Sequence, residues 1–181
     1  MKKNIPIYLY GLITILAGVF LLFSNDSSLN EIKFKLAITL LVGAFFAFAT
    51  AASRQNKQVQ FAYHQMHAFA MLLYAIALLF FCNSMERFIN FTFYLFIFYS
   101  FSEIILCSWI FNLAQKVVFK IVLIRVLLGL AVGIGAVIAL NFKLVTLQVF
   151  GVLFVMLGAN IMLYVPVMKA KEPIKMLNKE L

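Results

Sequence analysis

The chain has 181 residues, of which 65% are hydrophobic and only 12% are charged. Soluble domains are about half apolar and about a quarter charged, so this composition excludes a soluble domain and makes a lipid bilayer the expected solvent for most of the chain. The net charge of +9 does not indicate a nucleic-acid partner, because the Lys and Arg residues are spread between apolar runs and do not form one patch.

Six apolar runs follow one another along the chain, each about 20 residues long and so able to cross about 30 Å of hydrocarbon as a helix. The runs are residues 6–24, 33–53, 60–82, 88–111, 117–140 and 144–168. In lipid the backbone has no water to bond, so helices are the expected form. We therefore predict an all-α, polytopic membrane protein with one six-helix transmembrane domain, residues 1–168.

The first run follows Lys2 and Lys3, as the apolar part of a signal peptide would. No small-x-small cleavage site precedes Asn25, and the run shares the internal repeat described below. We therefore expect it to be a retained span.

The distribution of Lys and Arg predicts the orientation. Ten of these residues lie in the N-terminal segment, the second and fourth loops and the tail, whereas four lie at the opposite helix ends. Because positively charged loops stay in the cytoplasm, both termini are predicted to be cytoplasmic. In the tail, residues 169–181, apolar side chains share one helix face. This pattern favours a basic amphipathic helix lying on anionic lipid.

Small residues seven positions apart recur in the odd-numbered spans. The pairs are Gly11 and Gly18, Ala68 and Ala75, and Gly129 and Ala136. The even-numbered spans carry Gly43 and Gly158 towards their ends. Small residues on one face let helix backbones approach closely, so these five glycines are predicted to be packing residues. The pattern also predicts three repeated helical hairpins, residues 6–53, 60–111 and 117–168.

Two charged residues lie inside apolar runs, Glu103 in the fourth and Arg125 in the fifth. A charge near the bilayer centre costs about 2.5–3.5 kcal/mol on insertion scales, so it usually faces a partner or a cavity. Both residues lie 11 positions from Ala114, near the centre of the connecting loop. In an antiparallel hairpin, equal distance from the turn means equal depth. We therefore predict an intramembrane ion pair.

This pair has two interpretations. It can be an interhelical clamp that fixes the packing of the helices, which is a common role of buried pairs. Alternatively it can respond to protons, because acid could protonate Glu103 and release Arg125.

His64 and His67 lie three positions apart, on one face of the third predicted span. They are candidate pH-sensing residues together with Glu103. No third ligand stands nearby in the sequence, so no metal site is predicted, and the more usual role of such histidines is as polar rings at the headgroups. Near the span ends lie Tyr8, Tyr10, Tyr63, Trp109 and Tyr164, where aromatic belts are expected.

The three hairpins and the segment Ser102-Glu103-Ile104-Ile105 resemble the HdeD-like family of small six-helix bacterial membrane proteins. The matching residues are that segment and Gly11, Gly18, Gly43, Gly129 and Gly158. The resemblance covers nearly the whole chain and implies the six-helix architecture and a location in a bacterial inner (plasma) membrane. It also implies a role in acid-stress resistance, without an accepted reaction or ligand.

The expected function is therefore non-enzymatic, in stress tolerance or as a structural membrane component. No nucleophile–base pair or metal constellation can be assembled from the sequence, and no cofactor is predicted. Two alternatives remain, a small oligomeric transporter or channel subunit and an accessory subunit of a larger membrane complex. A transporter would normally break its helices at mid-membrane and gather polar groups there. The expected partners are lipid and either a second copy of the chain or other membrane proteins.

Overall fold

The computed structural model describes residues 4–24, 27–53, 58–111, 119–141 and 146–169, and these residues form helices with no strand among them. The helices are α1 (Ile5–Leu22), α2 (Leu29–Ala52), α3 (Gln58–Phe80), α4 (Met85–Phe111), α5 (Phe119–Asn141), α6 (Leu147–Met162) and the short α7 (Tyr164–Lys169). Six of them are long and apolar enough to cross a membrane. The predicted all-α fold is therefore confirmed, and the six apolar helices are compatible with a multi-pass membrane protein. Residues 170–181 of the tail, on which the predicted amphipathic helix falls, lie outside the described residues.

Two helix boundaries differ more than the others from the predicted apolar runs. Helix α2 begins at Leu29, before the run at residue 33, because the Ser28 side chain accepts a hydrogen bond from the Glu31 backbone and caps a polar first turn. Glu31 then pairs with Lys35 one turn later on the exposed surface. The sixth predicted span, residues 144–168, is divided at Leu163 into α6 and α7.

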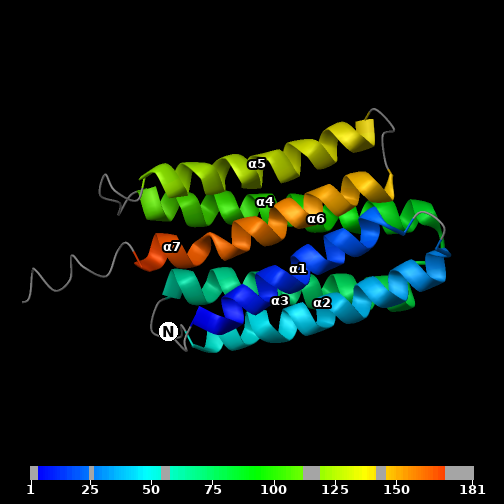
Figure 1. Cartoon of the computed structure of the whole chain (residues 1–181), viewed down its shortest axis with the longest axis horizontal. Helices are drawn as coiled ribbons and strands as arrows, with labels where there is room; N and C mark the ends of the chain where they lie inside the picture. Colours follow the sequence, from blue (N-terminus) through cyan, green and yellow to red (C-terminus); the bar gives the residue numbers. More distant parts are fainter. Residues whose placement is uncertain (1–3, 25–26, 54–57, 112–118, 142–145, 170–181) are drawn as a thin grey trace, which may run out of the picture.

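Each of the six long helices packs against its neighbours in sequence. Helix α1 also packs against α6, next to which it lies in Figure 1. The most extensive contacts join α1 to α6 and α2 to α3, and they are not those within the predicted hairpins. Helices α1, α3 and α5 begin at the same end of the bundle, on the left in Figure 1. We call this the terminal end. The three-hairpin repeat stays a prediction.

Two pairs of glycines bring α1 and α6 into contact. A Cβ on Gly11 would lie 3.0 Å from the backbone oxygen of Gly158, and a Cβ on Gly18 would lie 2.5 Å from that of Gly151. The helices run antiparallel, so the seven-residue spacing of the two glycines on α1 matches the seven-residue spacing of Gly151 and Gly158 on α6. Gly151 belongs to this contact although the repeat did not predict it. Gly43 differs, because a Cβ there would meet only Ile13 and Met71 side chains at 3.4 Å, an ordinary contact.

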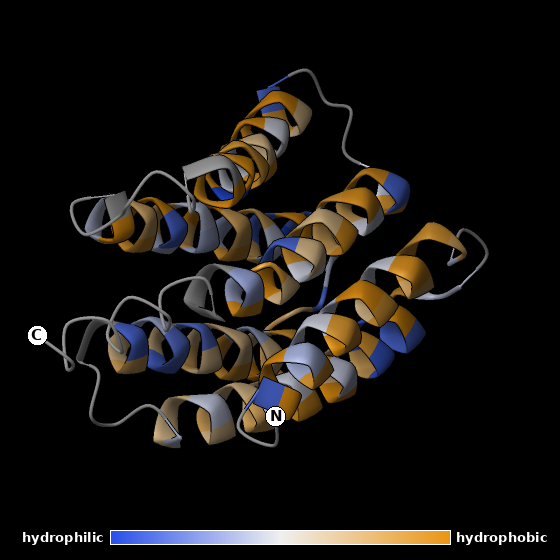
Figure 2. Cartoon of the chain, turned by 60° about the vertical axis from the view of Figure 1, so that its left-hand side comes forward, coloured by the Kyte–Doolittle hydropathy of each residue, from blue (hydrophilic) through white to orange (hydrophobic). Residues whose placement is uncertain are grey.

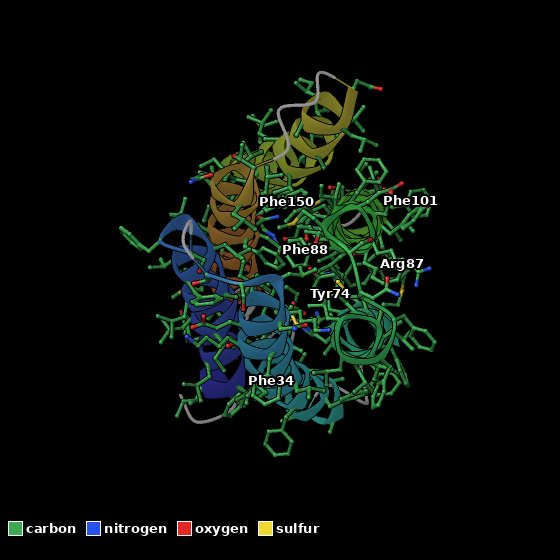
Figure 3. The ribbon with its side chains drawn as sticks, turned by 90° about the vertical axis from the view of Figure 1, so that its right-hand side faces the viewer. Phe34, Tyr74, Arg87, Phe88, Phe101 and Phe150 are labelled. Atoms are coloured by element: carbon green, nitrogen blue, oxygen red, sulfur yellow. The ribbon has the colours of Figure 1, made fainter. Side chains whose placement is uncertain are left out.

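Hydrophobic residues predominate along the helices, as Figure 2 shows in orange. Aromatic side chains fill the interior, where the rings of Phe88 and Phe150 lie with centroids 6.2 Å apart (Figure 3). Other large apolar side chains point outward, including Phe34 and Phe101, which are 57% and 62% exposed. Such outward apolar surfaces suit lipid contact.

Candidate functional site

Glu103 of α4 and Arg125 of α5 form an ion pair inside the bundle. Arg125 Nε donates to Glu103 Oε1 at 2.8 Å, and Arg125 Nη2 donates to Oε2 at 2.9 Å. The two residues are 1% and 0% exposed. The contact is therefore two-pronged and fully buried, which is the strongest form of an arginine–carboxylate pair. Glu103 lies about 12 Å before the last residue of α4, and α4 ends at the terminal end of the bundle.

Gly129 makes room for the carboxylate. It lies one turn after Arg125 on α5, and a Cβ on it would be 2.8 Å from Glu103 Cγ. The sequence predicted that Gly129 would permit close helix packing. The structure shows what fills the space: the Glu103 side chain lies over the α5 backbone.

Tyr63 of α3 ties a third helix to the pair. Its hydroxyl donates to Glu103 Oε2 at 2.5 Å and lies 3.1 Å from Arg125 Nη2, which donates to it. The Cys107 thiol, one turn after Glu103, donates to Oε1 at 3.4 Å. The acceptor positions of the carboxylate are thus occupied by groups of the protein itself. Buried polar groups generally require such partners.

Aromatic rings flank the Arg125 guanidinium. Its Cζ lies 5.3 Å from the ring centroid of Tyr164 and 5.9 Å from that of Tyr63. These two rings are nearly parallel, with centroids 6.0 Å apart. Cation–π contact of this kind stabilises a guanidinium that is removed from bulk solvent.

His67 of α3 holds a second hydrogen-bonded group. Its Nδ1 lies 2.6 Å from the Tyr10 hydroxyl of α1, and its Nε2 lies 2.7 Å from Ser102 Oγ of α4. Ser102 Oγ donates to the Tyr99 carbonyl at 2.8 Å, so towards His67 it must accept. We therefore assign the neutral tautomer with hydrogen on Nε2, in which Nδ1 accepts from Tyr10.

His64 faces a different neighbour. It is fully buried, and its ring lies 4.5 Å from that of Tyr164. The structure thus separates the two histidines: His67 joins Tyr10 and Ser102, whereas His64 packs beside Tyr164. No group of three His, Cys, Asp or Glu residues that could hold a metal ion occurs in the described part of the chain.

Two further polar pairs lie in the interior. Asn160 of α6 donates through Nδ2 to the Tyr99 hydroxyl at 2.8 Å. Nearer the other end of the bundle, the Tyr74 hydroxyl lies 2.6 Å from Thr92 Oγ1, which donates to the Phe88 carbonyl. Asn160 thus forms an interhelical hydrogen bond from α6 to α4.

The cavity beside His67 and Tyr99 is small. It has a volume of about 10 Å³ and lies between α3, α4 and α6, next to His67 and Tyr99. The rest of its lining is apolar and includes Met71, Leu95 and Phe154. This volume is about that of one water molecule. A larger cavity of about 260 Å³ lies near the starts of α4 and α6, beside Phe88 and Phe150.

The expectation of headgroup positions is wrong for several aromatic residues and for both histidines. Tyr10, Tyr63 and Tyr164 are 0–4% exposed and His64 and His67 are 0–3% exposed, all inside the bundle. A signal was available in the sequence, because polar pairs four residues apart share a helix face. Such pairs are Tyr63 and His67, Tyr99 and Glu103, and Asn160 and Tyr164.

Comparison of the chain with protein-family models, curated proteins and solved structures finds no match.

Proposed function

We propose that the protein is a non-enzymatic membrane protein of the bacterial inner membrane that contributes to tolerance of acid stress. The observation that carries this proposal is the burial of the Glu103–Arg125 pair, at 1% and 0% exposure, with the carboxylate enclosed by Tyr63 and Cys107. A carboxylate enclosed in this way has no position for a substrate. The resemblance to the HdeD-like family supplies the link to acid stress.

The same enclosure weighs against a transport pathway through the cluster. A conducting site needs a polar cavity that reaches water, whereas the cavity beside His67 and Tyr99 holds about 10 Å³ and is mainly apolar. A pair that joins α4 to α5, with Tyr63 adding α3, fits the role of a clamp between helices.

The clamp also suggests how acid could act. Breaking a buried pair by neutralising one partner is costly, because the other charge is then left without compensation. Protonation of Glu103 would leave Arg125 in that state, and the bundle would have to rearrange around it. We therefore place the acid response at this pair.

A survival assay tests the proposed function. A bacterial strain that lacks the gene would be complemented with the wild type, with Glu103→Gln or with Thr92→Val, and survival after an acid challenge would be counted. We expect the wild type and Thr92→Val to restore survival and Glu103→Gln to fail at equal membrane abundance. Equal survival of the strain with and without the wild-type gene would contradict the proposal.

The orientation is part of the proposal and has its own test. The excess of Lys and Arg on the side of the termini supports cytoplasmic ends. Fusion of alkaline phosphatase, which is active only outside the cytoplasm, to the C-terminus should give no activity. The same fusion after Ser84, in the α3–α4 turn, should be active.

A further inference from the structure

Two buried polar atoms beside the ion pair lack hydrogen-bond partners among the described residues. They are Arg125 Nη1, a donor, and Asn160 Oδ1, an acceptor. Both residues are 0% exposed. Leaving such groups unpaired in an apolar interior is costly, so native proteins nearly always satisfy them, often with an ordered water molecule.

The geometry of the guanidinium shows where Nη1 lies. Arg125 binds Glu103 through Nε and Nη2, so Nη1 is the nitrogen on the side that does not bind the carboxylate. The flanking rings are those of Tyr164 and Tyr63, at 5.3 Å and 5.9 Å from Cζ. Nη1 is itself buried, so the free donor lies inside the bundle, on the guanidinium that contacts these tyrosine rings, and not in contact with lipid.

Asn160 approaches the same pair from α6. Its Nδ2 is 3.7 Å from the position that a Cβ on Gly129 would occupy, and that position is 2.8 Å from Glu103 Cγ. Nδ2 already donates to Tyr99, so the amide oxygen Oδ1 is the atom that needs a partner. If the positions of the amide oxygen and nitrogen were exchanged, Nδ2 would be the unpaired atom, so one polar atom of the amide would lack a partner in either orientation.

The charge of the cluster selects the ligand. Glu103 and Arg125 compensate each other, so a bound anion would introduce an unpaired charge into the interior, and a metal ion would face the guanidinium. A neutral ligand that can both accept and donate fits both atoms. We propose that water molecules bind at Arg125 Nη1 and Asn160 Oδ1, so that the ion pair has an internal hydration site. This site is independent of the proposed role in acid tolerance.

The chain provides its own reporters and control. Tyr63 and Tyr164 flank the proposed water site, and both are at most 4% exposed. Tyr74 is equally buried, at 5% exposure, but its hydroxyl is paired with Thr92, whose own hydroxyl donates to the Phe88 carbonyl. Tyr74 is therefore a matched tyrosine at a site that needs no water.

Hydroxyl-radical footprinting of the whole protein in nanodiscs tests the site. X-rays generate radicals from water, and bound internal water labels the side chains that touch it. Mass spectrometry should find Tyr63 and Tyr164 oxidised several-fold faster than Tyr74. Labelling of all three at the same low rate would overturn the proposal, as would labelling of Tyr74 at the rate of the other two.

A variant removes one of the two atoms at which water is proposed to bind. Asn160→Leu should lower the oxidation of Tyr164 several-fold relative to the wild type and leave Tyr74 unchanged, whereas Thr92→Val should not affect Tyr164. Unchanged labelling of Tyr164 in a folded Asn160→Leu protein would overturn the assignment of Asn160. The comparison of tyrosines within the wild type does not depend on whether this variant folds. Because the readout is oxidation and not survival, failure here is distinct from failure of the proposed function.

Discussion

Gly18 of α1 and Gly151 of α6 lie in direct backbone contact, so that a Cβ on Gly18 would be 2.5 Å from the Gly151 carbonyl oxygen. Gly11 and Gly158 make the equivalent contact one seven-residue step away. The first and last long helices are therefore joined along their backbones. In lipid, where apolar surface gives no driving force between helices, such close packing is a main source of association.

The glycine contact predicts that Gly18→Ala destabilises the bundle. Alanine is the better helix former, but its methyl group would clash with backbone, which cannot move aside as a flexible side chain can. We expect a loss of about 1–3 kcal/mol, typical of overpacking, measured as the free energy of unfolding in detergent. Gly43→Ala is the control, because its Cβ would make ordinary contacts at 3.4 Å. Equal stability of the two variants would contradict the backbone contact.

A double-mutant cycle tests the energetic coupling of Glu103 and Arg125. Each of Glu103→Gln and Arg125→Leu should destabilise the protein by about 3–5 kcal/mol, because one partner is left buried without its counterpart. Arg125→Leu alone should be worse than the double variant, in which neither charge remains. The measurement is the midpoint of unfolding in detergent. Losses that simply add would show that the two residues do not interact.

The Tyr63 hydroxyl is predicted to stabilise the ion pair. Tyr63→Phe keeps the ring beside Arg125 but removes the donor to Glu103 Oε2 and the acceptor for Nη2. A hydrogen bond to a charged group contributes about 1.5–3 kcal/mol, so thermal unfolding should shift to lower temperature by a corresponding amount. Tyr94→Phe, at a residue 67% exposed on the lipid-facing surface, should have little effect. Similar shifts in both variants would argue against the contact.

The tautomer of His67 is open to direct measurement. The hydrogen bonds from Tyr10 and to Ser102 predict a neutral ring with hydrogen on Nε2. Nitrogen-15 solid-state NMR at neutral pH should therefore show one protonated and one unprotonated ring nitrogen, with the protonated signal assigned to Nε2. In a Tyr10→Phe variant the Nδ1 signal should shift, because that atom loses its donor. Signals of a doubly protonated ring would contradict the assignment.

The amino-acid sequence was sufficient for features that depend on local hydrophobicity or on neighbouring helices. The six spans follow from the length of the apolar runs. The depth match of Glu103 and Arg125 follows from their equal distance to the loop, because a short loop obliges α4 and α5 to be antiparallel neighbours. The cost of a lone buried charge then makes their contact the favourable arrangement.

Contacts between helices far apart in the sequence were decided only by the tertiary structure. The packing of α1 on α6 through Gly18 and Gly151, and the bond from Tyr10 to His67 across α1 and α3, have no loop that sets their register. They depend on how each helix is rotated about its axis. Hydrophobicity is a poor guide to that rotation in lipid, because the outer and inner faces of these helices are both apolar. Only close packing and the pairing of polar side chains distinguish the faces.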